Sequence, residues 1–186
     1  MKVEITVIPD VLLLTPRVFA DTRGFFYESY NQKSFLDKTE LDVTFVQDNH
    51  SRSQKNVLRG LHYQIGQPQG KLVRVLSGVI QDIAVDLRQS SSTFGKSVSY
   101  ILSAENCQQL WIPAGFAHGF LVLSDSAEVA YKTTDYYAPN EERCLLWNDS
   151  EVAIAWQLDG ESILSNPILS DKDAIGKSLK EAELFA

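Results

Sequence analysis

The chain has 186 residues, and its content of 44% hydrophobic and 22% charged residues is typical of a globular protein and excludes a disordered one. At about 150 residues per domain, this length predicts a single domain over residues 1–186. The formal charge of −7 argues against a nucleic-acid backbone or an anionic membrane as a partner, although a few local cations can still bind a small anion.

The N-terminal segment and the cysteines bear on the cellular compartment. The longest apolar run near the N-terminus is residues 11–14, and it has Glu4 and Asp10 nearby, so it is too short and too acidic for a signal peptide. No stretch approaches the ~20 apolar residues of a membrane span. Cys107 and Cys144 form no CxxC motif and are too few for a disulfide framework. We therefore expect a cytoplasmic protein without a membrane segment.

Short β-type segments separated by turn residues dominate the chain, and helical pattern is scarce. Residues 76–79 (Leu-Ser-Gly-Val) join two such segments tightly, which predicts a β-hairpin. Many short strands at near-regular spacing predict an all-β sandwich or barrel. In chain order, the predicted elements are a helix over 31–38, strands over 57–63, 71–77, 79–87, 98–102, 110–112, 119–123 and 127–134, and a helix over 173–184.

Alternation within two of these strands places their polar residues. In the strand over 79–87, Asp82 and Asp86 share one face, and we expect both carboxylates to face water. In the strand over 127–134, Tyr131 shares a face with Val129 and Thr133, which is typical of an aromatic residue in the core or at its rim.

The chain has three histidines, each in a segment rich in polar residues or glycine: His50, His62 and His118. Strict alternation would put Arg59 and His62 on opposite faces of a strand, but a bulge at Gly60 would bring both to one side. The segment Pro113-Ala114-Gly115 predicts a sharp turn that aims His118 into the mouth of a barrel.

A metal site and a metal-free site are both compatible with these histidines. Three histidines can bind zinc, and the spacing Pro113/Gly115/His118 matches half of the pattern of metal-binding cupins. The other half, an HxH pair followed by Glu, is missing. We therefore expect no metal and a histidine that acts as an acid or base near neutral pH.

Three basic residues stand out near these histidines: Arg23, Arg59 and Lys71. Each alone is typical of a solvated surface charge. Together with His62 they would suit an anionic substrate such as a diphosphate.

Eight segments, in their order and spacing, resemble the dTDP-4-dehydrorhamnose 3,5-epimerase family, a group of metal-free enzymes of nucleotide-sugar metabolism. The resemblance runs from about Ile8 to Asp173, nearly the whole chain. The segments are DTRGFFYE (21–28), FVQDNHSRS (45–53), LRGLHYQ (58–64), GKLVRVLSGVIQDIAVDLR (70–88), STFGK (92–96), WIPAGFAHGF (111–120), EVAYKTTDYY (128–137) and LSDKD (169–173).

The resemblance implies a fold and a reaction. The implied fold is an all-β, cupin-type double-stranded β-helix, or jelly-roll barrel, with a few short helices and a C-terminal tail over 174–186. The implied assembly is a homodimer that exchanges N-terminal strands, so that residues 23–28 serve the partner's pocket. The implied reaction, which needs no cofactor, inverts C3 and C5 of dTDP-4-keto-6-deoxy-D-glucose and gives dTDP-4-keto-L-rhamnose.

The resemblance also implies roles for individual residues. His62 matches the general base, Asp173 its carboxylate partner, Lys71 the cation near the C4 oxygen, and Tyr131 the acid on the opposite face of the sugar. The implied substrate-binding residues are Arg23, Phe26, Glu28, Gln47, Asn49, Arg59, Asp82, His118, Tyr137 and Lys172.

Two alternatives remain open at this stage. One is an enzyme that inverts a single centre, or an isomerase of a related nucleotide-linked 4-keto sugar. The other is a binding module or a metal-containing cupin.

Overall fold

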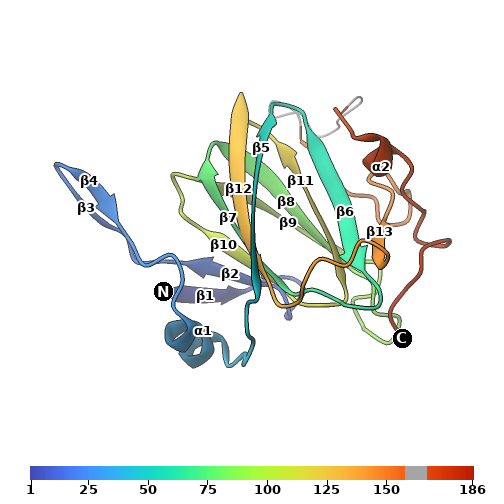
Figure 1. Ribbon diagram of the computed structural model, residues 1–186, viewed down its shortest axis with the longest axis horizontal. Coiled ribbons are helices and arrows are strands. Elements are labelled where there is room, and N and C mark those ends of the chain that lie inside the picture. Colours follow the sequence, from blue (N-terminus) through green and yellow to red (C-terminus); the bar gives the residue numbers. More distant parts are fainter. Residues whose placement is uncertain (158–166) are drawn as a thin grey trace.

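The computed structural model describes residues 1–157 and 167–186 of the chain. Two antiparallel sheets form its body (Figure 1). In spatial order, the six-stranded sheet comprises β1 (Lys2–Ile5), β2 (Leu12–Thr15), β10 (Gln109–Ile112), β7 (Lys71–Ser77), β12 (Ser126–Thr133) and β5 (Gln47–Gln54). The five-stranded sheet comprises β13 (Glu142–Cys144), β6 (Leu58–Gln64), β11 (Phe116–Val122), β8 (Val79–Asp86) and β9 (Ser97–Ser103).

The main core lies between the two sheets, because its buried side chains come from both. Val73 and Val129 from the six-stranded sheet pack in one cluster with Ile80 and Phe120 from the five-stranded sheet. The predicted all-β, cupin-type jelly roll is confirmed, and each predicted strand is present with its ends within three residues of the prediction.

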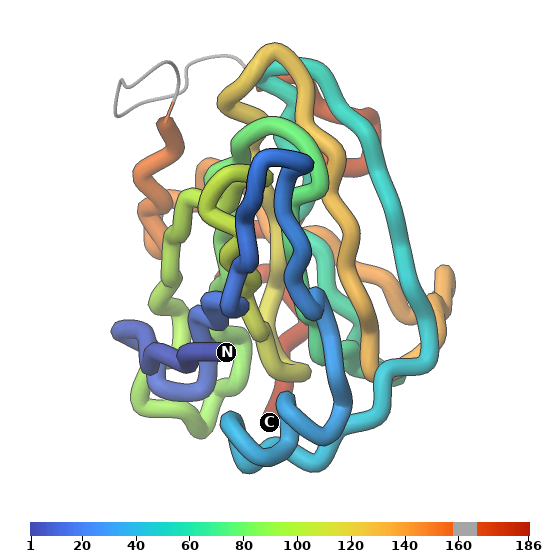
Figure 2. The backbone as a smooth tube through the Cα atoms, turned by 90° about the vertical axis from the view of Figure 1, so that its left-hand side faces the viewer, coloured from blue at the N-terminus to red at the C-terminus, as the bar shows by residue number. Residues whose placement is uncertain are grey.

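A small hairpin and one helix lie between β2 and β5 in the chain. The hairpin consists of β3 (Phe19–Asp21) and β4 (Gly24–Phe26), projects to one side in Figure 1, and points toward the viewer in Figure 2. The predicted helix over 31–38 is confirmed as α1 (Gln32–Thr39), which begins where the Asn31 side chain accepts a hydrogen bond from the Ser34 amide at 3.0 Å. It is anchored by the buried ring of Phe35.

The turn at residues 76–79 does not form the predicted hairpin. β7 and β8 are consecutive in the chain but belong to different sheets, so this turn carries the chain from one layer to the other. Gly78 has a φ of +80°, and a Cβ at this position would lie 2.1 Å from the carbonyl oxygen of Ser126. Close packing against the start of β12, rather than pairing of adjacent strands, therefore determines this turn.

The predicted helix over 173–184 is also wrong, since only α2 (Asp171–Ala174) is helical there. The backbone after α2 forms only a local turn, in which the Ala182 amide donates to the Ser178 carbonyl at 2.9 Å, and it otherwise pairs with distant segments. It forms parallel bridges from Lys177 to Leu145 and from Phe185 to Arg88. This tail helps to cover a second apolar cluster on the outer face of the five-stranded sheet.

None of the helices among the described residues has the length and the apolar composition that crossing a bilayer requires. The predicted single domain over 1–186 includes residues 158–166, which lie outside the described residues. The single domain therefore stays a prediction.

Candidate active site

A cavity of about 450 Å³ lies beside β6. This strand lies on the side of the molecule away from the hairpin (Figure 1). Its lining comes from six strands, namely β5, β6, β7, β11, β12 and β13, from neighbouring loops, and from the segment that contains α2. Eight of the residues predicted for the site line it: Arg59, His62, Lys71, His118, Tyr131, Tyr137, Lys172 and Asp173.

A bulge in β6 brings Arg59 and His62 to this cavity, as the glycine between them predicts. His118 pairs with His62 and Phe120 pairs with Arg59, so β6 has one residue more than β11 across this stretch. Gly60 has a φ of +106°, and a Cβ on it would lie 2.6 Å from the carbonyl oxygen of His118. Glycine is therefore required both by the backbone conformation and by the close approach of β11.

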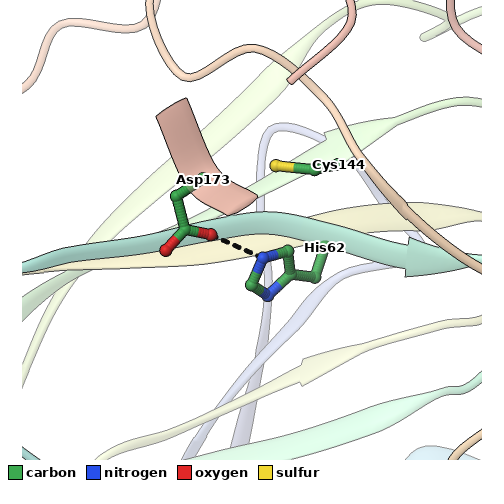
Figure 3. A group of neighbouring side chains, drawn as sticks. All are labelled: His62, Cys144 and Asp173. Carbon is green, nitrogen blue, oxygen red and sulfur yellow. Dashed lines mark ion pairs between the residues drawn. The ribbon is translucent and has the colours of Figure 1, made fainter. Parts of the chain in front are cut away.

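His62 forms an ion pair with Asp173, although the two residues are far apart in the chain. The Nε2 atom of His62 lies 2.6 Å from the Oδ1 atom of Asp173 (Figure 3). Asp173 also accepts hydrogen bonds from the Gly60 amide at 3.2 Å and from the Ser170 hydroxyl at 2.7 Å. Burial opposes ionisation of this carboxyl, but the contacts with His62 and Ser170 outweigh it and hold its pKa below the usual value.

Backbone hydrogen bonds on both sides of α2 fix the position of Asp173. On one side, the Leu58 amide donates to the Ile168 carbonyl at 3.0 Å, and the Ile168 amide donates to the Asn56 carbonyl at 2.8 Å. On the other side, the Lys177 amide donates to the Cys144 carbonyl at 2.9 Å. The segment that carries the carboxylate is thus attached to the two strands that carry His62 and Cys144.

Lys71 is a buried cation at the wall of the same cavity. Its Nζ atom donates a hydrogen bond to the main-chain carbonyl of His62 at 3.1 Å, and the residue is only 7% exposed. Burial lowers its pKa to about 8, against the opposing effect of the carboxylates of Asp82 and Glu142. The ammonium group therefore sits where a newly formed negative charge would stabilise it.

Asp82 and Asp86 do not face water, so that prediction is wrong. Both are fully buried, because the body covers both faces of β8. The Oδ1 atom of Asp82 lies 2.8 Å from Nε2 of His118, and the His118 ring lies 6.4 Å from the ring of Tyr131. Asp82 thus does not line the cavity but supports a histidine that does.

Tyr131 projects from β12 toward the core, as its position in the strand predicts. Burial raises the pKa of its phenol, with a smaller opposite effect from Arg59. The phenol therefore keeps its proton near neutral pH and can donate it.

Glu142 is a residue of this site that the sequence does not single out. It lies on β13, its side chain is only 14% exposed, and it forms an ion pair with Lys172. The Tyr137 hydroxyl donates a hydrogen bond to its Oε2 atom at 2.6 Å. Burial opposes its ionisation, but the bonds from Lys172 and Tyr137 outweigh it and hold its pKa below the usual value. Since β13 is only three residues long and its pattern is not alternating, the signal in the sequence is weak.

Besides Asp82, five predicted residues lie outside the cavity lining. Gln47 and Asn49 lie on β5, where the Gln47 amide donates to Asn49 at 2.9 Å and its carbonyl accepts from the Tyr137 amide at 3.0 Å. Arg23, Phe26 and Glu28 lie on the projecting hairpin or just after it, and this chain does not bring them to its own cavity.

The three histidines do not come together as a set of metal ligands among the described residues. His50 pairs with Glu128 at 3.0 Å on the exposed β5, and His118 pairs with Asp82. The group of metal-ligating side chains that does converge in the described part of the chain is His62, Cys144 and Asp173, whose ligand atoms all lie within 4.8 Å of one another.

Comparison with known proteins gives a consistent result. A model of the dTDP-4-dehydrorhamnose 3,5-epimerase family matches residues 5–181. The dTDP-4-dehydrorhamnose 3,5-epimerase of Pseudomonas aeruginosa is 58% identical over 185 residues, which are 100% of this chain and 99% of the relative.

Two solved structures extend the comparison. The epimerase of Legionella pneumophila, in complex with dTDP-4-keto-L-rhamnose, superposes with a TM-score of 0.91 at 50% identity over 96% of this chain and 93% of that one. A 3'-monoepimerase of Streptomyces bikiniensis, in complex with dTDP-quinovose, has a TM-score of 0.85 at 31% identity over 95% of this chain and 87% of that one. From the matched family model and the identity over its full length, the chain belongs to the dTDP-4-dehydrorhamnose 3,5-epimerase family.

Proposed function

We propose that this protein inverts C3 and C5 of dTDP-4-keto-6-deoxy-D-glucose to form dTDP-4-keto-L-rhamnose. The observation that carries the proposal is that His62, Lys71 and Tyr131 line one cavity, with Asp173 bound to His62. An imidazole, an ammonium and a phenol are the base, the oxyanion stabiliser and the acid that such a reaction needs.

The proposed mechanism begins with removal of a proton from a carbon next to the C4 ketone. Since Nε2 of His62 faces Asp173, Nδ1 is the nitrogen that accepts this proton. The Asp173 carboxylate orients the ring and stabilises the imidazolium that forms. The electron pair moves to O4, where the ammonium of Lys71 stabilises the enolate. The Tyr131 phenol then returns a proton to the opposite face of the carbon, which inverts the centre.

The charges of the cavity support an anionic substrate despite the acidic chain. Three cations line it, namely Arg59, Lys71 and Lys172, together with the carboxylates of Glu142 and Asp173. Arg59 is oriented by a hydrogen bond from its Nε to the Ser53 hydroxyl at 2.9 Å. A guanidinium fixed in this way suits a diphosphate, which accepts paired hydrogen bonds.

We further propose that the protein works as a homodimer in which the hairpin of one copy completes the pocket of the other. The hairpin projects from the body, and its Phe25 and Phe26 are 66% and 70% exposed. In this dimer, the diphosphate and the base of the substrate would be contacted by the partner's Arg23, Phe26 and Glu28. We expect this dimer in the cytoplasm, without nucleic acid or membrane as partner, which the two free cysteines support.

Mixing two inactive variants tests the shared pocket. If the hairpin acts in trans, Arg23→Ala and His62→Asn chains should regain activity when they are refolded together, since one pocket of the hybrid has both native residues. A mixture as inactive as either variant alone would contradict the exchange.

Proton exchange in deuterated water tests the reaction. We expect the wild type to exchange the C3 and C5 protons of the 4-keto sugar, and His62→Asn to abolish both exchanges. His50→Asn is the matched control, because this histidine lies on the exposed β5 outside the cavity lining. Exchange at the normal rate in His62→Asn would remove His62 as the base.

A single-centre epimerase is the second candidate function. It is favoured by the shared fold of the Streptomyces bikiniensis 3'-monoepimerase. NMR of the product distinguishes the two, because inversion of one centre changes the couplings at C3 or C5 alone. A product changed only at C3 would establish this second candidate.

A further inference from the structure

Antiparallel pairing of β13 with β6 places a cysteine beside the proposed base. Cys144 and His62 are direct partners across the two strands, so their side chains project from the same face. Asp173 approaches from α2, and Figure 3 shows its carboxylate to the upper left of the His62 ring and the Cys144 sulfur above the ring. The mechanism above uses His62 and Asp173 but gives Cys144 no part.

The three side chains form a donor set that suits zinc. Thiolate, imidazole and carboxylate are all common Zn²⁺ ligands, at about 2.3, 2.0 and 2.1 Å respectively. Tetrahedral coordination at these lengths needs ligand atoms about 3.3–3.6 Å apart. The His62–Asp173 contact of 2.6 Å would have to widen, and the longest separation in the group, at most 4.8 Å, would have to shorten. Both changes are about 1 Å, which side-chain rotation can supply.

The backbone holds the three ligands together and leaves access for an ion. Cys144 is fixed by the Lys177 amide, and Asp173 by the Gly60 amide. The side chain of His62 is 29% exposed and lines the cavity, so a fourth coordination position would face water. Three protein ligands and one open position are typical of accessible zinc sites.

We propose that His62, Cys144 and Asp173 form an inhibitory site for a borderline-soft divalent cation such as Zn²⁺. The inhibition, though not the binding, rests on the proposed function. Coordination at Nε2 places the remaining imidazole proton on Nδ1, the nitrogen that would accept the substrate proton. Coordination also binds the Asp173 carboxylate to the metal, so that it no longer stabilises the imidazolium of His62. The metal displaces one proton from the Cys144 thiol to water, and the hydrogen that neutral His62 carries on Nε2 moves to Nδ1. One S–H bond and the Nε2–H bond are therefore broken, and one Nδ1–H bond is formed.

Calorimetric titration with Zn²⁺ tests the site without reference to catalysis. We expect one Zn²⁺ per chain for the wild type, binding at least ~10-fold weaker for Cys144→Ser, and no binding of Mg²⁺, which prefers oxygen ligands. Cys107→Ser is the matched control, because this second free cysteine lies outside the cluster and should leave Zn²⁺ binding unchanged. Equal Zn²⁺ affinity of the wild type and Cys144→Ser would overturn the proposal.

The deuterium-exchange assay with added Zn²⁺ tests the inhibition. Without metal, Cys144→Ser should be as active as the wild type. With Zn²⁺ present, the wild type should lose exchange and recover it with EDTA, whereas Cys144→Ser should need at least ~10-fold more Zn²⁺ for the same loss. Stoichiometric binding that leaves exchange intact would overturn the inhibition. The activity of His62→Asn without metal tests the proposed function separately. Full activity of this variant would refute the role of His62 as the base, but it would not bear on the metal site.

Discussion

Replacing Lys71 with methionine should reduce activity and at the same time stabilise the fold. Methionine keeps a flexible apolar chain in the buried space and removes the ammonium. Loss of a preorganised group at a developing oxyanion typically costs about 3–4 kcal/mol in transition-state stabilisation, so kcat should fall about 10²–10³-fold.

The stability gain follows from the buried charge. The pKa of Lys71 is about 8 in the fold, against its ordinary value of 10.5, because burial disfavours the ammonium. At about 1.4 kcal/mol per pKa unit, keeping this lysine protonated at pH 7 costs the fold about 3 kcal/mol. Methionine removes this cost but leaves the His62 carbonyl without the hydrogen bond from Nζ, which offsets about 1 kcal/mol. The net gain in the free energy of unfolding should be about 2 kcal/mol.

Guanidinium unfolding between pH 7 and 10.5 measures this effect. Between pH 8 and 10.5 the unfolded chain binds more protons at Lys71 than the folded chain does, so the wild type gains stability as the pH rises. The advantage of Lys71→Met should therefore be complete below pH 8 and should disappear by about pH 10.5. Lys132→Met serves as the control, because that lysine pairs with the exposed Asp48 at the surface.

One result would refute the reasoning about Lys71. If Lys71→Met were less stable than the wild type at pH 7, and the difference did not change up to pH 10.5, the ammonium would not be destabilised by burial. If the variant kept full activity, no oxyanion would form beside this residue.

Three further changes test other parts of the structure. Tyr131→Phe should reduce inversion at C5 more than exchange at C3, measured by NMR in deuterated water, and equally small effects would exclude it as the acid. Glu142→Gln should raise KM more than it lowers kcat, because Lys172 and Tyr137 at the cavity would both lose the carboxylate that they contact. In steady-state kinetics, a fall in kcat alone would contradict this role. Asp86→Asn should lower the free energy of unfolding by about 2 kcal/mol at pH 7. Burial raises the pKa of the Asp86 carboxyl, but hydrogen bonds from Arg88, Ser91 and Thr93 outweigh this effect and hold the pKa at about 2. That stabilisation is complete above pH 3.8 and is lost as the pH falls toward 2, so an acid titration in which wild type and variant lose stability in parallel would contradict it.

The chain sequence by itself determined the fold class and most of the strands. A period-two pattern over a segment such as β12 reflects a buried face, and this signal is local. The polar strand β5 is not predicted, because it is an edge strand with alternate residues exposed and little apolar pattern. The role of Gly60 could also be predicted from neighbouring residues, because only a bulge can put Arg59 and His62 on one side of a strand.

No local pattern decided which residues share the site: apart from the family resemblance, only the tertiary structure brings them together. The pairing of His62 with Asp173 depends on a C-terminal segment that bridges back to β6 and Leu145, and no local pattern encodes such a long-range contact. Burial of Asp82 could not be read from alternation, because a strand covered on both faces has no solvent side. The place of Cys144 beside His62 likewise depends on the register between two strands about 80 residues apart, which is set by packing of the whole body.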